Sequence, residues 1–275
     1  MKIINALFFL LLLSSCAGAK EINYTASTPA AAPVIRAFLN IPITDSVDFI
    51  RWKLTLDDNQ YILQCNYGIG KPNTNGFMYD GKTITIKGTW KKEKNILQLH
   101  HDNHILRLME LNANLLHLLD ADNNLLVGNG GWSYTLNNMT ASLIDKINNT
   151  SRQTIFKDSM VFEGRTPCAV PGIIADGKLC YKIKWRIILY ANAIKNDTGF
   201  YKILGTPWRD RNGRKGNWVT RTGNNGQTIY QLNDEKGNGL IYLLQADENI
   251  LLFTDAKGNL LVGDEDFSYT LNRKY

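Results

Sequence analysis

Apolar and polar residues alternate along short stretches of this chain, and turn-forming residues separate the stretches roughly every 8–12 positions. The alternation runs from Arg51 to Leu56 and from Thr83 to Trp90, and it recurs at 96–99 and 105–108. A period of two residues is typical of strands with one buried face. Residues 45–275 hold no clear 3.6-residue apolar period outside a short stretch near 142–148. The pattern therefore predicts an all-β protein.

The predicted strands occur twice, because the two halves of the chain repeat each other. Residues 50–56 match 183–189, residues 120–128 match 255–263, and residues 133–137 match 268–272. The offset between the halves changes only across stretches rich in Gly, Asn and Pro, where turns absorb insertions. Each copy has enough strands, roughly seven, to close into a barrel. We expect two tandem antiparallel barrels; the alternative is that the copies join edges into one larger barrel or sandwich.

The first residues resemble a bacterial export signal. Lys2 precedes an apolar run from Ile3 to Leu13 that is too short to span a bilayer as a mature helix. The run ends in Leu13-Ser14-Ser15-Cys16, which resembles the bacterial lipobox. The resemblance implies cleavage before Cys16 and attachment of diacylglycerol to its thiol. The alternative is an ordinary cleaved signal with Cys16 unmodified.

These features divide the chain into five expected parts. From Gly18 to about Ala37 the residues are small and polar with no core periodicity, so we expect a lipidated cysteine followed by a flexible tether over residues 16–40. The expected parts are a signal peptide at 1–15, the tether at 16–40, a first barrel at 41–140, a linker at 141–158 and a second barrel at 159–275.

Charge and the known catalytic motifs narrow the range of functions. The chain has 31 Lys+Arg and 25 Asp+Glu, and Lys2 is the only charged residue before Cys16, so the mature part has a net charge of +5. An envelope location argues against nucleic acid as a partner, and anionic lipid headgroups are better candidates for a basic patch. No nucleophile elbow, metalloprotease motif, phosphate-binding loop or dinucleotide-binding glycine motif occurs. We therefore expect a protein that is not an enzyme.

Three cysteines remain if Cys16 is lipidated. Cys65 stands in a predicted strand among alternating apolar residues, which favours a buried, inert thiol. Cys168 and Cys180 flank a Pro-Gly turn, and we expect a disulfide that stabilises this loop by ~2–3 kcal/mol. The alternatives are a soft thiolate site for Cu(I) or zinc and a pair of free thiols.

Three histidines cluster in the first copy, at His100, His101 and His104. Asp102-Asn103 is suited to a two-residue hairpin turn, which would place His101 opposite His104 with their Cβ atoms about 5 Å apart. Two imidazoles so placed, with His100 or Asp102 nearby, would suit a surface site for Cu(II), zinc or Ni(II). The alternative is an exposed polar turn without a ligand. The sequence requires no cofactor, and copper or zinc are the metals these side chains would suit.

The second half contains Phe162-Glu163-Gly164-Arg165-Thr166-Pro167-Cys168, then a segment from Cys180 to Arg186 and a final segment from Phe267 to Arg273. These segments resemble the NlpE family of copper-homeostasis lipoproteins. The resemblance implies an outer-membrane location, a lipocalin-like antiparallel barrel, and roles in copper tolerance, surface adhesion and envelope-stress signalling. The chain departs from the family's Cys-x-x-Cys pair, because Ala169-Val170-Pro171 follows Cys168. A metal or redox site of that type is therefore not carried over.

We expect a non-enzymatic, lipid-anchored outer-membrane protein that acts in copper homeostasis or envelope-stress sensing and contacts an envelope protein. One alternative is a lipocalin-like carrier of a small ligand, which needs an open apolar cavity. That alternative fails if the side chains of Trp52, Trp90, Trp185 and Trp218 fill the barrels. Another is a surface interaction or adhesion module, which an exposed strand edge or an apolar patch on the second copy would indicate.

Overall fold

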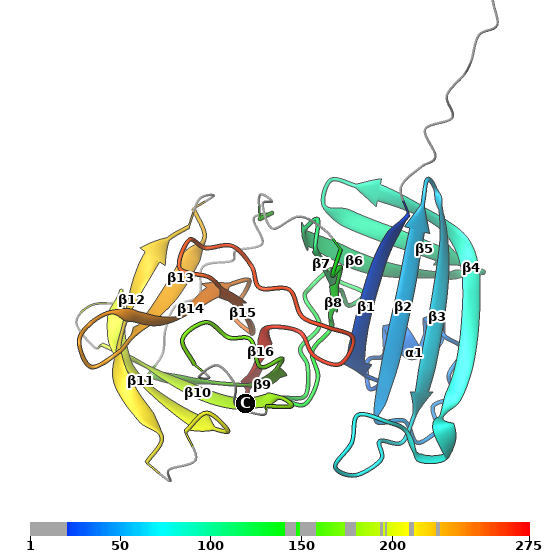
Figure 1. Cartoon of the computed structure of the whole chain (residues 1–275). Coiled ribbons are helices and arrows are strands. Elements are labelled where there is room, and N and C mark those ends of the chain that lie inside the picture. Colours follow the sequence, from blue (N-terminus) through cyan, green and yellow to red (C-terminus); the bar gives the residue numbers. More distant parts are fainter. Residues whose placement is uncertain are drawn as a thin grey trace, which may run out of the picture.

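The computed structural model describes residues 21–140, 147–148, 158–173, 180–192, 195, 197–208, 212–223 and 226–275. Their strands form two closed antiparallel barrels of eight strands each, which lie side by side (Figure 1). The prediction of two tandem all-β barrels is confirmed, and the copies do not merge into one sheet. No helix among these residues is long and apolar enough to cross a membrane.

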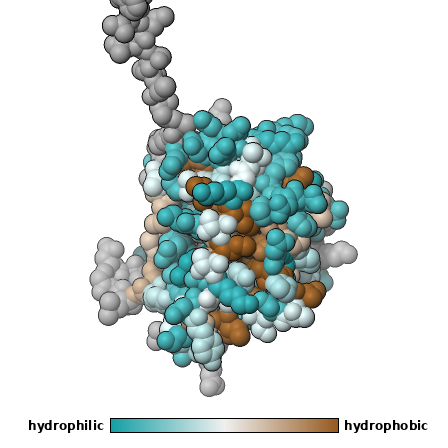
Figure 2. Space-filling model, turned by 90° about the vertical axis from the view of Figure 1, so that its right-hand side faces the viewer, coloured by the Kyte–Doolittle hydropathy of each residue, from teal (hydrophilic) through white to brown (hydrophobic). Residues whose placement is uncertain are grey.

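Barrel 1 contains the first eight strands in chain order, and β8 closes it against β1. Its strands are β1 (Ile22–Pro29), β2 (Phe49–Asp57), β3 (Gln60–Gly68), β4 (Lys82–Glu93), β5 (Ile96–His101), β6 (His104–Asn112), β7 (Leu115–Leu118) and β8 (Thr135–Asn137). The helix α1 (Pro33–Phe38) and the short 3-10 helix η1 (Met78–Asp80) lie in the connections. The outer face of this barrel is largely hydrophilic, with a band of hydrophobic residues running down one side (Figure 2).

Barrel 2 repeats this arrangement, and β16 closes it against β9. Its strands are β9 (Ser159–Thr166), β10 (Ile183–Ala191), β11 (Thr198–Gly205), β12 (Arg214–Thr222), β13 (Thr228–Asn233), β14 (Gly239–Gln245), β15 (Ile250–Thr254) and β16 (Thr270–Lys274). The alternating burial along β10 places every second side chain inside the barrel, as the sequence pattern predicts.

The described part of the segment predicted as a flexible tether, residues 21–40, is instead part of barrel 1. Residues 22–29 form β1, which pairs with β2 along its whole length, and the following α1 buries Ile35 and Phe38 in the barrel core. The expected start of the barrel at residue 41 is therefore wrong. The error has a physical reason: small inward-facing residues such as Ala26 and Thr28 are fully buried here, and they give a weak hydrophobic signal.

One hydrogen bond recurs in the core of both barrels. The indole Nε1 of Trp52 donates to Thr28 Oγ1 at 2.8 Å, and the indole Nε1 of Trp185 donates to Thr166 Oγ1 at 2.9 Å. Each bond joins the end of the first strand to the second strand, and all four residues are buried. A buried indole N–H requires an acceptor, so the Thr-Pro sequence that ends β1 and β9 fixes the tryptophan in both copies.

The two barrels meet at an interface with approximate twofold symmetry. Ser133 Oγ lies 2.5 Å from Ser268 Oγ, and Thr135 Oγ1 lies 2.9 Å from Thr270 Oγ1. The members of each pair are 135 residues apart, the offset that relates the two repeats in this region. In a twofold interface a residue near the axis meets its own counterpart. The barrels therefore contact each other as the two subunits of a homodimer would.

Contacts away from the axis are reciprocal. Asn272 Oδ1 accepts a hydrogen bond from the backbone N–H of Gly128 at 2.6 Å, and Asn137 Oδ1 accepts one from Gly263 at 2.9 Å. A shared apolar cluster surrounds these polar contacts. It contains Leu111, Leu115, Leu119 and Leu125 from barrel 1 and Ile229, Leu244, Ala246, Ile250, Leu252 and Leu260 from barrel 2.

His117 breaks the symmetry, because Leu252 occupies its place in the second copy. The imidazole is fully buried; its Nε2 lies 2.9 Å from the carbonyl oxygen of Leu126 and its Nδ1 lies 2.9 Å from Thr135 Oγ1. A carbonyl can only accept, so Nε2 carries the proton and Nδ1 accepts from the threonine hydroxyl. Burial lowers the pKa of His117 to about 4, which keeps the ring neutral.

Replacement of His117 by Leu is expected to remove a pH-dependent part of the stability. The pKa is about 4 in the folded state against 6.5 for an exposed ring, so only the unfolded state binds this proton between those values. The free energy of unfolding that depends on a neutral His117 is therefore fully present above pH 6.5. It decreases by about 1.4 kcal/mol per pH unit as the pH falls from 6.5 towards 4. Urea unfolding of both forms at pH 7 and pH 5 measures it. Equal pH dependence in the two proteins would contradict the assignment.

The interface is also expected to hold the barrels together without a covalent link. A protease site inserted between residues 150 and 156 allows the chain to be cut after folding. Because the interface contains a shared apolar cluster and reciprocal hydrogen bonds, both halves should elute together in size-exclusion chromatography, at the position of the uncut chain. Elution as two separate barrels would show that the interface is weak.

Candidate functional site

The connection between the first two strands of each barrel packs into that barrel's core. In barrel 1 it contains α1, whose Ile35 and Phe38 side chains are buried in the core cluster. In barrel 2 a short loop takes this place, with Val170 buried and Ile173 partly buried against the core. The loop has no helix among its described residues and is held by a covalent bond instead. This loop and the residues beneath it form the candidate site.

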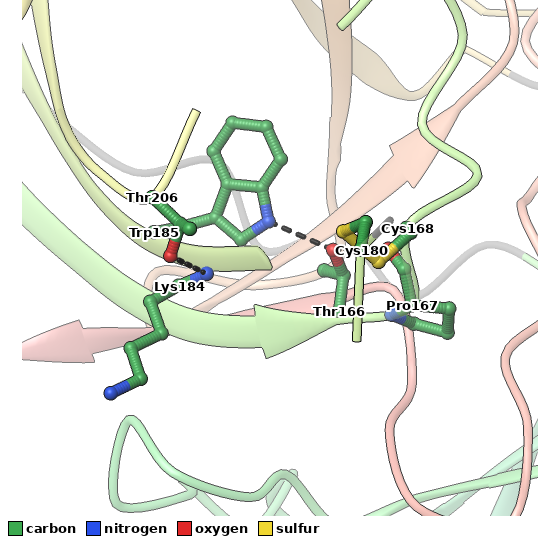
Figure 3. The surroundings of a disulfide bond; sticks show 7 residues. All are labelled: Thr166, Pro167, Cys168, Cys180, Lys184, Trp185 and Thr206. Atoms are coloured by element: carbon green, nitrogen blue, oxygen red, sulfur yellow. Dashed lines mark hydrogen bonds between the residues drawn. A yellow bond between two sulfur atoms is a disulfide. The ribbon is translucent and has the colours of Figure 1, made fainter. Parts of the chain in front are cut away.

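A disulfide joins Cys168 to Cys180 and closes the loop at its base (Figure 3). Their Cα atoms are 5.9 Å apart, and both cysteines are partly buried against the core of barrel 2. Thr166 lies beside the bond, and Trp185 lies on the far side of Thr166, joined to it by the indole hydrogen bond described above (Figure 3). The disulfide therefore adjoins the pair of residues that positions the first strand on the second.

A shallow pocket of about 230 Å³ opens beside the loop. Residues 170–172 form one wall, and residues 239–242 and 253–256 form the other. The pocket reaches Phe253, whose ring centroid lies 5.1 Å from that of Trp185. The described part of the loop thus shares a pocket with an aromatic side chain of the core, and its Val170 is buried there.

A buried tyrosine contacts the same loop from below. Tyr269 is hydrogen bonded to the backbone of Ala169, and burial raises the pKa of its hydroxyl to about 12. Its counterpart Tyr134 makes the same kind of contact with the backbone of Ala32, and burial also raises its pKa to about 12. Both phenols are therefore protonated at neutral pH and act as anchors for the two connections.

The histidine hairpin lies in barrel 1, apart from the two cysteines. β5 and β6 pair with His101 opposite His104, and Asp102 adopts the left-handed conformation (φ 48°) that the tight turn needs. The ring of His101 meets Phe38 edge-on at 5.9 Å, and its Nε2 lies 3.6 Å from Asp102 Oδ2. His100 pairs with Ile105, and its Nε2 is buried without a hydrogen-bond partner.

No group of three or more His, Cys, Asp or Glu side chains in the described part of the chain is arranged to hold a metal ion. The structure does not bring the five candidate metal ligands, His100, His101, His104, Cys168 and Cys180, together, because the histidines and cysteines lie in different barrels. With Cys168 and Cys180 in a disulfide, neither presents a thiolate. A copper or zinc site stays a prediction.

The other cysteines have simpler settings. Cys65 is a free thiol in the core of barrel 1, and burial raises its pKa far above the ordinary value. A thiol in this state is a poor nucleophile. The expected lipidation site Cys16, the signal peptide at 1–15 and most of the expected linker at 141–158 lie outside the described residues.

Aromatic side chains fill the interior of the barrels. Trp52, Trp185 and Trp218 are at most 3% exposed and belong to the two core clusters, and Trp90 is partly buried against the first. These side chains therefore occupy interior volume that a carrier of a small ligand would need to keep open.

Two structural groups were not predicted from the sequence. The first is the Thr28–Trp52 pair, although Thr28-Pro29 in the first copy repeats Thr166-Pro167 in the second and would have signalled it. The second is His117, a single polar residue within the apolar run 115–118, where the aligned copy has leucine. In both cases an alignment of the two repeats across their full length carries the signal.

Comparisons with protein-family models, with curated proteins and with solved structures find no match for this chain.

Removal of the disulfide is expected to destabilise barrel 2. A Cys168→Ser/Cys180→Ser variant loses the loop closure, which is worth about 3 kcal/mol for a loop of this size in the chain-entropy picture. Denaturant unfolding of wild type with and without reductant measures the effect, and reductant should leave the variant unchanged. A wild-type midpoint that does not respond to reductant would contradict a stabilising role for this bond.

Proposed function

We propose that the chain is a non-enzymatic, lipid-anchored envelope protein of the NlpE type, in which the Cys168–Cys180 loop responds to the redox or copper state of the envelope. The observation that carries this proposal is the position of the disulfide, which joins the two ends of a loop whose Val170 packs into the core of barrel 2. Reduction of the bond frees the loop, and Trp185 and Phe253 beneath it become accessible. A partner protein in the envelope would read this change.

Physical arguments support a disulfide as the responding group. Thiol–disulfide exchange needs access to a sulfur atom, and both cysteines retain part of their exposure. The counterpart connection in barrel 1 achieves its packing with α1 and no covalent bond, so the fold itself does not need a disulfide at this place. Reduction is therefore expected to destabilise barrel 2 without abolishing its fold.

Copper enters the proposal through the chemistry of the reduced pair. Two thiolates are soft ligands that suit Cu(I). Two Cu(II) ions, each taking one electron from the pair and becoming Cu(I), would oxidise the thiolates and restore the disulfide. The His101–His104 hairpin is a second candidate for Cu(II) on a separate surface. A lipocalin-like carrier function receives less support, because Trp52, Trp185 and Trp218 occupy the barrel interiors.

The proposal is tested in cells that lack the protein and are complemented with full-length variants. Wild type is expected to restore copper tolerance and a copper-dependent envelope-stress response. The Cys168→Ser/Cys180→Ser variant imitates the open loop and should make the response independent of copper. Cys16→Ala is expected to leave the membrane fraction and to lose both effects.

The histidine hairpin provides the matched control. A His101→Ala/His104→Ala variant keeps the disulfide, so a response that depends on the loop should persist in it. Calorimetric titration with copper and zinc, on oxidised and reduced residues 17–275, separates the two sites in vitro. If the cysteine variant behaves as wild type in cells, the disulfide is structural and the proposed function is wrong.

A further inference from the structure

One strand of barrel 1 has a long edge that no other strand of the described chain covers. β4 pairs with β3 over residues 82–89 and with β5 only over residues 89–93. Residues 82–88 therefore have a neighbouring strand on one side alone. In barrel 2 the equivalent stretch of β12 that pairs only with β11 is shorter, at residues 214–217. The long free edge is thus a property of the first copy.

The hydrogen-bonding groups at this edge can be assigned. Trp90 N–H donates to the carbonyl oxygen of Asn59, on the β3 side of the strand. Because successive residues of a strand point their N–H and C=O groups to opposite sides, those of Thr83, Thr85 and Lys87 face the free edge. No backbone partner for these three residues occurs among the described residues, and all three side chains are exposed. The edge is available for another strand.

The side chains define what kind of strand would fit. Ile84 and Ile86 point inward, and Ile84 is only partly buried against the barrel core. Figure 2 views the side of barrel 1 on which β4 lies, and a band of hydrophobic residues runs down it between hydrophilic ones. A strand added beside β4 would place every second side chain next to this inward row, so those side chains should be apolar.

The outward row favours acidic residues in the added strand. β4 carries four lysines and one glutamate. Lys82, Lys91 and Lys92 pair with Asp45, Glu93 and Glu110, whereas Lys87 is exposed and has no carboxylate partner among the described residues. A cross-strand carboxylate would supply one. The unpaired charge of Lys87 also disfavours pairing of this edge with the identical edge of a second copy.

We propose that the free edge of β4 binds an extended peptide segment in which apolar and acidic residues alternate, by addition of a strand to barrel 1. Main-chain hydrogen bonds to Thr83, Thr85 and Lys87 hold the segment, its apolar side chains lie beside the inward row of Ile84 and Ile86, and a carboxylate pairs with Lys87. The site is in barrel 1 and does not depend on the disulfide loop of barrel 2.

A short fluorescein-labelled peptide that alternates Glu and Val is the probe, and fluorescence anisotropy with the full mature chain is the measurement. Thr85→Pro removes an N–H on the free side and keeps the pairing with β3, so it should weaken binding by about tenfold or more. Thr85→Val keeps the backbone N–H and should bind as wild type. Lys87→Glu should weaken binding, and a peptide that alternates Lys and Val should not bind.

Hydrogen exchange gives a second readout that does not depend on a variant that folds poorly. In the free protein the amides of Thr83, Thr85 and Lys87 should exchange fast, while those of Ile84 and Ile86 are protected by β3. The Glu/Val peptide should slow only the first set. The proposal is overturned if wild type shows no saturable binding, if Thr85→Pro binds unchanged, if the peptide protects other residues, or if the edge instead pairs two copies into a dimer.

Discussion

The contact between the two barrels is the constraint on which the rest of the structure depends. Thr135 and Thr270 lie on the short strands β8 and β16, which close their own barrels and also meet each other across the interface. The strands that close each barrel are therefore also the strands through which the two barrels associate. A displacement of β8 would open barrel 1 and at the same time remove the partner surface of barrel 2. This coupling makes the two barrels one structural unit, although each has its own core.

Much of the fold follows from period-two alternation and from the internal repeat, because both signals come from residues that alternate between core and solvent. The start of barrel 1 could not be predicted in this way, since Ala26 and Thr28 are buried without being strongly apolar. The opposition of His101 and His104 did follow from local turn chemistry. The free edge of β4 could not, because it depends on where a strand changes its partner from β3 to β5, and no local residue pattern specifies that point.

The two connections between first and second strands show two solutions to one packing problem. In barrel 1 α1 buries Ile35 and Phe38, and apolar contact alone holds the segment. In barrel 2 the connection buries fewer apolar side chains, chiefly Val170, and the disulfide adds a covalent restraint. A connection held by apolar area is stable under any redox condition, whereas one held partly by sulfur chemistry depends on its surroundings. The same position in the fold is thus held by a helix without a covalent bond in one copy and by a reducible bond in the other.

The twofold arrangement within a single chain has a consequence for how this protein can evolve. In a dimer of identical subunits every substitution appears on both sides of the axis. A histidine buried near the interface would therefore occur twice, and its desolvation would destabilise the dimer twice. In this chain the residue equivalent to His117 in the second copy is Leu252. Among the described residues, barrel 2 alone has a disulfide, and barrel 1 alone has the long free edge of β4. Because both copies belong to one chain, a substitution in one barrel does not have to be accommodated in the other, and the two barrels can acquire different features.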